Sequence, residues 1–248
     1  MIDKNKFIVS NCILEILLKD MTTGKNIVWG TDQYGYKPDS NMEIEQVLKN
    51  GILPRIFKSY EDQKARTKSK AEVFTPLYIV KRMNDTVDDE FQGSDYDYIK
   101  RIVLEITCGE APFIVSRYDA STGDEIPLDD RQGMFDRKMR IVNKIGKETW
   151  FKNMLMSLES IYAYELQGDS LLLARINIYN DICEWYMDLY GVGMKDNIEV
   201  ANHIVNNIIQ MDGLDMMVPY TGIPARIMDW NNGEMVRFDD KTDETSLF

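Results

Sequence analysis

Apolar and polar residues follow two spacings along this chain, and each spacing predicts a different kind of element. Spacing of three and four residues predicts helices, whereas short apolar runs bounded by turn residues predict strands. The predicted helices are 7–20, 43–49, 76–91, a stretch from 113, another from 131, and 150–158, 170–190 and 199–206. The predicted strands are 26–30, 102–104, 160–165, 207–214 and two runs that flank an Asn-Gly turn at 231–233.

Helix 76–91 is expected to start at Pro76, with Thr75 as its cap. Ile79, Met83 and Val87 are four residues apart, so they are expected to form its apolar face.

Three of the predicted strands alternate with helices, which predicts an α/β fold built on a parallel sheet. An acid stands at the end of each strand: Glu105, Glu165 and Asp212. The carboxyl ends of parallel strands meet at one edge of a sheet, which is where such folds bind ligands. Segment 119–143 interrupts the alternation and is expected to be an insertion with a hairpin at 122–124.

A tight turn, Thr-Cys-Gly-Glu-Ala-Pro at 107–112, joins the first of these strands to the helix predicted from Phe113. A strand, a tight turn and a helix together bring backbone N–H groups close to a ligand. Pro112 suits the first turn of a helix, where its missing N–H would have no partner. Gly109 is the turn's one glycine, so the three-glycine dinucleotide fingerprint is absent.

Glu105, Cys108, Gly109 and Phe113 resemble the first motif of the S-adenosylmethionine-dependent DNA adenine methyltransferases. In that motif an acid precedes a Cys-Gly pair, a small-residue turn and a phenylalanine. Ala111 stands where those enzymes usually carry a second glycine.

Three further segments extend this resemblance over residues 61–215. The resemblance implies that Phe74-Thr75-Pro76 flanks the methionine end of S-adenosylmethionine and that Glu105 lies near its amino group. It also implies that Glu165 holds the ribose hydroxyls and that Asp212 accepts from the adenine amine. The implied cofactor-binding residues are Phe74, Thr75, Pro76, Glu105, Thr107, Cys108, Gly109, Glu110, Ala111, Glu165, Leu166, Asp212 and Gly213.

The order of motifs is similar to that of methylase subunits of restriction-modification systems. It implies a Rossmann-like methyltransferase domain at 61–248, preceded by an N-terminal appendage at 1–60 and closed by a C-terminal β-hairpin. The implied activity is methylation of the adenine 6-amino group in DNA. The implied partners are DNA and a restriction or specificity subunit.

One motif of the family has no counterpart here, so the catalytic residues stay unassigned. Those enzymes hold the flipped target base with Asn/Asp-Pro-Pro-Tyr/Phe, and Val218-Pro219-Tyr220 is the nearest sequence. Tyr220 is the candidate for the missing aromatic residue. Three alternatives follow: an active enzyme with a diverged or shared pocket, a cofactor-binding or regulatory subunit that needs a partner chain, and a binder of another adenosine nucleotide.

Charge and composition narrow the picture further. The net charge of −12 argues against a broad basic DNA-binding face. Lys64, Arg66, Lys68 and Lys70 form the one notable basic cluster, either a solvated surface or a rim that contacts phosphates. Three cysteines and the lack of a spanning apolar stretch or secretory leader suggest a cytoplasmic protein without a membrane segment. The single histidine, His203, is expected to be structural, and no metal site is expected in the acidic stretch 119–136.

Overall fold

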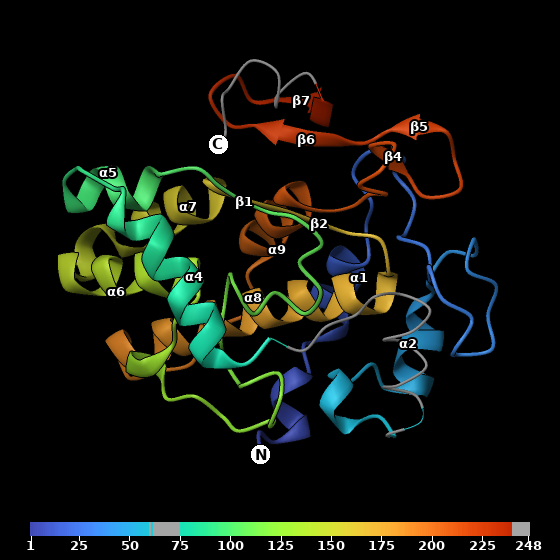
Figure 1. Cartoon of the computed structure of the whole chain (residues 1–248), viewed down its shortest axis with the longest axis horizontal. Helices are drawn as coiled ribbons and strands as arrows, with labels where there is room; N and C mark the ends of the chain where they lie inside the picture. The colour runs from blue at the N-terminus through green and yellow to red at the C-terminus, as the bar shows by residue number, and fades with distance from the viewer. Residues whose placement is uncertain (60, 62–74, 240–248) are drawn as a thin grey trace.

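A computed structural model describes residues 1–59, 61 and 75–239, and it has a three-stranded parallel sheet at its centre (Figure 1). The strands are β1 (Val103–Glu105), β2 (Ile161–Glu165) and β3 (Ile208–Gln210), in the order β1-β2-β3. Val103 pairs with Ile161, and Ala163 pairs with Ile208. The predicted mixed α/β architecture with a parallel sheet is therefore confirmed.

Helices connect these strands and cover one face of the sheet (Figure 1). Four of them confirm predicted helices: α2 (Ile44–Asn50), α7 (Trp150–Glu159), α8 (Gly168–Tyr190) and α9 (Ile198–Asn207). The others are α1 (Asn11–Leu17), α4 (Leu77–Asp89), α5 (Asp95–Lys100) and α6 (Met134–Ile145), with short 3-10 helices at Lys4–Phe7, Arg55–Phe57, Leu128–Asp130 and Lys147–Thr149. The first helix is shorter than predicted because Ser10 caps it, its side chain accepting from the Ile13 N–H.

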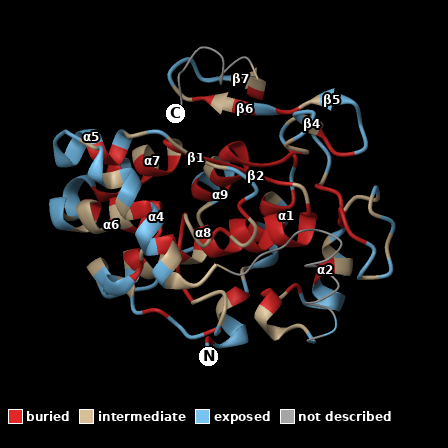
Figure 2. Ribbon diagram, viewed as in Figure 1, coloured by how far each residue is buried: buried red, intermediate tan, exposed pale blue. Residues whose placement is uncertain are grey.

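Strand β2 is buried along its whole length (Figure 2), and its side chains alternate between the two faces of the sheet, which divides the core. Ile161 and Ala163 pack into the main core, which the helices enclose. Tyr162 and Tyr164 pack into a smaller cluster with C-terminal residues such as Phe238. The sheet therefore has helices on one face and C-terminal strands on the other.

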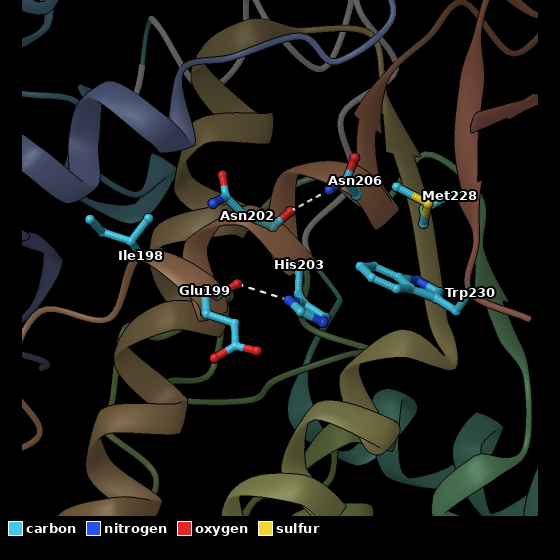
Figure 3. A pocket seen from close by; sticks show the side chains of 7 residues that line it. All are labelled: Ile198, Glu199, Asn202, His203, Asn206, Met228 and Trp230. Carbon is cyan, nitrogen blue, oxygen red and sulfur yellow. Dashed lines mark hydrogen bonds between the residues drawn. The ribbon is translucent and has the colours of Figure 1, made fainter. Parts of the chain in front are cut away.

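The C-terminal strands form two antiparallel pairs. β4 (Met217–Val218) pairs with β5 (Ile223–Pro224), and β6 (Arg226–Asp229) pairs with β7 (Glu234–Arg237). The second pair is the hairpin predicted from the Asn-Gly turn, in which Gly233 has a φ of 70°. Trp230 in this turn stacks on His203 of α9 with ring centroids 4.3 Å apart (Figure 3), which fixes the hairpin to the helix.

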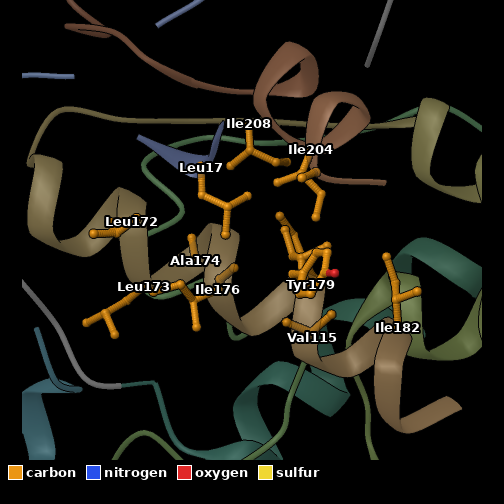
Figure 4. Packing of buried hydrophobic residues seen from close by; sticks show 14 of the residues in the cluster. Leu17, Val115, Leu172, Leu173, Ala174, Ile176, Tyr179, Ile182, Ile204 and Ile208 are labelled. Atoms are coloured by element: carbon orange, nitrogen blue, oxygen red, sulfur yellow. The ribbon is translucent and has the colours of Figure 1, made fainter. Parts of the chain in front are cut away.

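Helix α8 runs through the main core and is apolar over much of its circumference (Figure 4). Its one buried arginine, Arg175, is fully enclosed and donates to the carbonyl oxygens of Leu17, Lys19 and Ile208 at 2.6, 2.9 and 2.8 Å. Leu17 is the last residue of α1, Lys19 follows it closely, and Ile208 is the first residue of β3. The arginine therefore connects the N-terminal region to the sheet.

A glutamine side chain makes a second connection between the N-terminal region and the sheet. Gln210 Oε1 accepts from the Val28 N–H, and Gln210 Nε2 donates to the Val28 carbonyl, each at 2.8 Å. The predicted strand 26–30 is wrong, because Asn26 and Val28 form only isolated bridges with Lys19 and Asn41. The proposed boundary between residues 60 and 61 borders the part of the chain outside the description, and it stays a prediction.

The helix predicted from Phe113 is wrong. Residues 112–114 form a turn, and the carbonyls of Phe113 and Ile114 accept from the Met134 and Phe135 N–H groups. The Ser116 N–H also donates to Asp136 Oδ2 at 2.8 Å. The start of α6 therefore uses the backbone groups that a helix would have paired internally.

Helix α4 begins one residue later than predicted and buries a different face. Pro76 is its N-cap, and the Leu77 N–H donates to Asp119 Oδ2 at 2.8 Å. Val80 and Asn84 are the buried positions, whereas Met83 and Val87 are exposed. Asn84 is buried because its amide donates to the carbonyls of Phe113 and Gln132. The predicted apolar face is therefore wrong.

The segment 119–143 contains a turn and a helix, close to its predicted form. Tyr118 and Glu125 form an antiparallel bridge around the 122–124 turn. The helix in this segment is α6, which starts at Met134, three residues after its predicted start at Arg131. Elsewhere in the sheet, strand β3 (Ile208–Gln210) is shorter than the predicted strand 207–214.

Candidate functional site at the carboxyl edge of the sheet

Three acids lie at the carboxyl ends of the three parallel strands. Glu105 and Glu165 are the last residues of β1 and β2, and Asp212 follows β3 by two residues. Glu165 is in register with Gln210, and its carbonyl accepts from the Met211 N–H at 3.2 Å. The sheet therefore places all three acids along one edge, together with their predicted neighbours Leu166 and Gly213.

The 107–111 turn is hydrogen-bonded to the end of β2. The Cys108 N–H donates to the Tyr164 carbonyl, and the Gly109 N–H donates to Glu165 Oε2, each at 2.9 Å. Glu165 Oε1 accepts from the Gln167 N–H at 2.9 Å, just before α8. The Glu165 side chain, 7% exposed, therefore fixes the turn and the start of α8 relative to each other.

The turn has a conformation that suits glycine. Thr107, Gly109 and Ala111 have φ values of 52°, 56° and 67°, in the left-handed region that side chains with a Cβ disfavour. Ala111 is fully buried. Its backbone thus adopts a glycine-like conformation at the position where the motif described above usually has glycine. Strained residues of this kind gather at ligand sites.

Glu105 has an unusual electrostatic environment. Burial raises the pKa of its carboxyl group from 4.5 to about 7. Within the part of the chain that the structure describes, the carboxylate has no hydrogen bond or ion pair. A cationic or hydrogen-bond-donating group beside it would favour the ionised form, so Glu105 is suited to bind an amine.

Glu110 holds the turn to the rest of the molecule. Its Oε1 accepts from the Arg55 N–H at 2.6 Å, and its Oε2 accepts from the Tyr118 hydroxyl. Its carbonyl accepts from Asn177 Nδ2 of α8 at 3.0 Å. These bonds fix the position of Glu110, and the ligand contact that the resemblance implied for it stays a prediction.

Asp169 is a site residue that the sequence did not indicate as functional. It is the second residue of α8 and is fully buried. Its Oδ2 accepts from Lys58 Nζ at 3.0 Å and from the Tyr34 hydroxyl at 3.1 Å. The signal available in the sequence was the acid four residues after Glu165, at the start of a helix.

Asp212 and Gly213 lie in a compact loop after β3. Asp212 Oδ1 accepts from the Leu214 N–H at 3.0 Å. A Cβ atom on Gly213 would lie 2.7 Å from the ring of Tyr164, so glycine allows this close approach. Asp212 itself is half-buried, and its carboxylate stands at the same edge as Glu165.

Thr75 and Pro76 lie at the start of α4, which Asp119 caps. Asp119 directly follows Tyr118, whose hydroxyl donates to Glu110 in the 107–111 turn. Hydrogen bonds therefore connect the start of α4 to that turn. Phe74 lies outside the described residues, as do Lys64, Arg66, Lys68 and Lys70.

Tyr220 lies in the loop between β4 and β5, where it is 61% exposed with a φ of 61°. Burial raises the pKa of its hydroxyl, and the nearby charges of Asp39 and Asp212 raise it further. Among residues 75–239 no fourth strand joins the parallel sheet.

No family model, curated protein or solved structure matches this chain. In the ranges that the structure describes, no helix combines the length and apolarity needed to cross a membrane. The same ranges contain no group of three or more histidine, cysteine or acidic side chains arranged to hold a metal ion. In the stretch 119–136, Asp119 and Asp136 accept from backbone N–H groups, whereas Asp124 and Glu125 pair with the N-terminal ammonium and Lys6.

Proposed function

We propose that this chain binds S-adenosylmethionine at the carboxyl edge of its sheet and belongs to the machinery of DNA adenine methylation in a restriction-modification system. The observation that supports this proposal most is the placement of Glu105, Glu165 and Asp212 at three consecutive strand ends around a strained turn. The strand order β1-β2-β3 corresponds to one half of a Rossmann-like sheet.

The residues present fit the chemical groups of S-adenosylmethionine. Glu105, half-buried and without a described partner, suits the ammonium group of the methionine moiety. Glu165 suits the ribose hydroxyls, because carboxylate oxygens accept hydrogen bonds from two donors each. Asp212 suits the 6-amino group of adenine. The glycine-like turn at 107–111 lets the backbone approach between them.

When bound, S-adenosylmethionine would supply an electrophilic methyl group on its sulfonium sulfur. The residues of this chain would hold and orient the nucleoside, since methyl transfer depends mainly on alignment with the accepting amine. Glu110, Asp169 and their partners would keep the turn and α8 in fixed positions.

A second candidate is a cofactor-binding or regulatory subunit that methylates only with a partner chain. Two observations favour it. The sequence lacks Asn/Asp-Pro-Pro-Tyr/Phe, and the described residues include no fourth parallel strand to carry such a motif. In this version a partner would supply the pocket for the flipped base.

Calorimetric titration with S-adenosylmethionine and S-adenosylhomocysteine tests the binding proposal, with ATP as the competing adenosine ligand. Glu105→Gln is the principal variant, because the Glu105 side chain makes no described hydrogen bond whose loss would disturb the fold. We expect it to weaken S-adenosylmethionine binding about tenfold, in line with the loss of one charge-assisted contact. The exposed Glu148→Gln is the matched control, and Glu165→Ala should abolish binding.

Absence of binding by the wild-type chain would refute the cofactor proposal, and tighter binding of ATP would favour the nucleotide alternative. If S-adenosylmethionine binds, transfer of labelled methyl to mixed-sequence DNA separates the two candidates. Activity of the isolated chain indicates the enzyme, whereas activity only after addition of a partner subunit indicates the incomplete subunit.

A further inference from the structure

A second candidate binding site lies near the amino ends of the parallel strands, at the opposite edge of the sheet from Glu105, Glu165 and Asp212. A hollow of about 510 Å³ lies between α9 and the β6–β7 hairpin (Figure 3), lined by Ile198, Glu199, Asn202, His203, Asn206, Met228 and Trp230. Trp230 Nε1 donates to Asn207 Oδ1 at 2.7 Å, and Asn207 directly precedes β3. The hollow is therefore near the amino end of β3, away from Glu165 and Asp212.

The charges around this hollow leave one negative charge uncompensated. His203 has an acceptor at each ring nitrogen, the Glu199 carbonyl at 2.8 Å from Nδ1 and Glu159 Oε1 at 3.2 Å from Nε2. Both contacts are satisfied when the ring is protonated, and the imidazolium then balances Glu159. The Glu199 carboxylate is exposed and makes no described hydrogen bond or ion pair. No lysine or arginine lines the hollow among the residues that the structure describes.

One buried acceptor in the lining of the hollow has no hydrogen-bond donor. Asn206 is 7% exposed, and its Oδ1 has no hydrogen-bond donor within the described chain. The side-chain amide of Asn202 is exposed and makes no described hydrogen bond. The remaining walls are apolar or aromatic: Ile198, Met228 and Trp230. A ligand that fits must bring N–H donors, one positive charge and an apolar portion.

We propose that this hollow binds an arginine side chain of a partner polypeptide. A guanidinium group has one charge and five donors in a plane, and it stacks well on an indole ring. Its methylene groups would lie against Ile198 and Met228, as the stems of long cationic side chains do on apolar surfaces. The exposed rim at Ile198, 53% accessible, leaves the hollow open to a side chain from another chain.

A nucleic acid is the less favourable occupant. A nucleobase would also stack on Trp230, and asparagine amides can pair with base edges. Its phosphates, however, would approach Glu199 on a chain whose net charge is −12, with no lysine or arginine in the described lining to hold them.

Nuclear magnetic resonance titration of the full chain tests this proposal. The probe is acetyl-Ala-Arg-Ala-amide, and acetyl-Ala-citrulline-Ala-amide is its neutral isostere. We expect saturable shifts of the Trp230 indole N–H and the Asn202 and Asn206 amides, with millimolar affinity, because a single exposed cation–π contact and ion pair are weak. The citrulline peptide should leave these signals unchanged.

Glu199→Gln should weaken binding of the arginine peptide about fivefold, since it removes the charge that the guanidinium would pair with. Asp196→Asn is the matched control, because Asp196 is an exposed acid three residues before Glu199 that does not line the hollow. Equal binding of the citrulline peptide, unchanged affinity in Glu199→Gln, or saturable shifts with a single-stranded oligonucleotide instead of the peptide would each overturn the proposal. Because S-adenosylmethionine plays no part here, this test can fail independently of the proposed function.

Discussion

Lys138 carries the most quantitative prediction of this structure. It is fully buried in α6, where Nζ donates to the Arg101 carbonyl and to Ser160 Oγ. Burial, with a smaller contribution from the charge of Arg101, lowers the pKa of its amine from 10.5 to about 7. A tenfold change in the proton-binding constant corresponds to about 1.4 kcal/mol, so the folded chain penalises the charged amine by about 5 kcal/mol.

The sign of the pH dependence follows from proton binding. Above the folded-state pKa of about 7, the unfolded chain holds a proton on this lysine that the folded chain does not. The contribution of Lys138 to the free energy of unfolding therefore rises with pH, by about 2.5 kcal/mol between about pH 6 and about pH 9. Below the folded-state pKa both states are protonated, and the contribution is constant at its lowest value.

Urea unfolding of wild type and Lys138→Met across this pH range measures the effect. We expect the stability of wild type relative to the variant to increase by about 2.5 kcal/mol from about pH 6 to about pH 9. Lys144→Met is the matched control, because Lys144 belongs to the same helix but its side chain is 78% exposed. Parallel pH profiles for wild type and Lys138→Met would refute the reasoning, whatever the absolute cost of the substitution.

Three further predictions concern backbone strain, close packing and one side-chain hydrogen bond. Thr107→Gly should stabilise the chain by about 0.5 kcal/mol, because it relieves a left-handed backbone at an exposed position; a lower urea midpoint would contradict this. Gly168→Ala should destabilise by at least about 3 kcal/mol, since its Cβ would lie 2.0 Å from the Val28 carbonyl oxygen, and retention of the wild-type melting temperature would be inconsistent with that contact. Trp230→Phe loses the hydrogen bond to Asn207 and should cost about 1 kcal/mol in thermal unfolding, whereas no change would indicate that the hairpin contributes little there.

The central strands and their acidic ends could be predicted from the sequence because the signals are local. An apolar run of strand length, an acid and a turn residue follow one another at both Glu105 and Glu165. The C-terminal hairpin was equally accessible, since Asn-Gly favours the left-handed turn conformation that Gly233 adopts. These elements need no information from distant parts of the chain.

The incorrect predictions all involve a distant partner. The apolar spacing after Phe113 favours a helix, yet the start of α6 takes up the carbonyls of Phe113 and Ile114. Asn84 is polar in the sequence pattern but buried in the structure, because two backbone carbonyls accept from its amide. In the same way, Gln210 pairs with Val28 as a neighbouring strand would. The spacing of apolar residues along a segment carries no information about such distant contacts.

For the candidate site too, the sequence indicated the local features and missed the contacts between distant residues. The sequence located the acids at the strand ends. It did not indicate that Glu110 accepts a hydrogen bond from the Arg55 N–H or that Asp169 accepts one from Lys58 Nζ. These positioning contacts join residues more than 50 positions apart, and only the folded chain brings them together.

The two N-terminal connections also constrain how the chain can fold during synthesis. Gln210 meets Val28 across 182 positions, and Arg175 meets Leu17 across 158. The first 30 residues therefore lack their partners until most of the chain has left the ribosome, and a high separation of contacts slows folding. A nascent chain stalled before Gln210 should remain bound by holding chaperones. A fragment lacking the N-terminal region would leave the buried Arg175 guanidinium with only the Ile208 carbonyl, and the Gln210 amide with only the Leu166 carbonyl, as described acceptors.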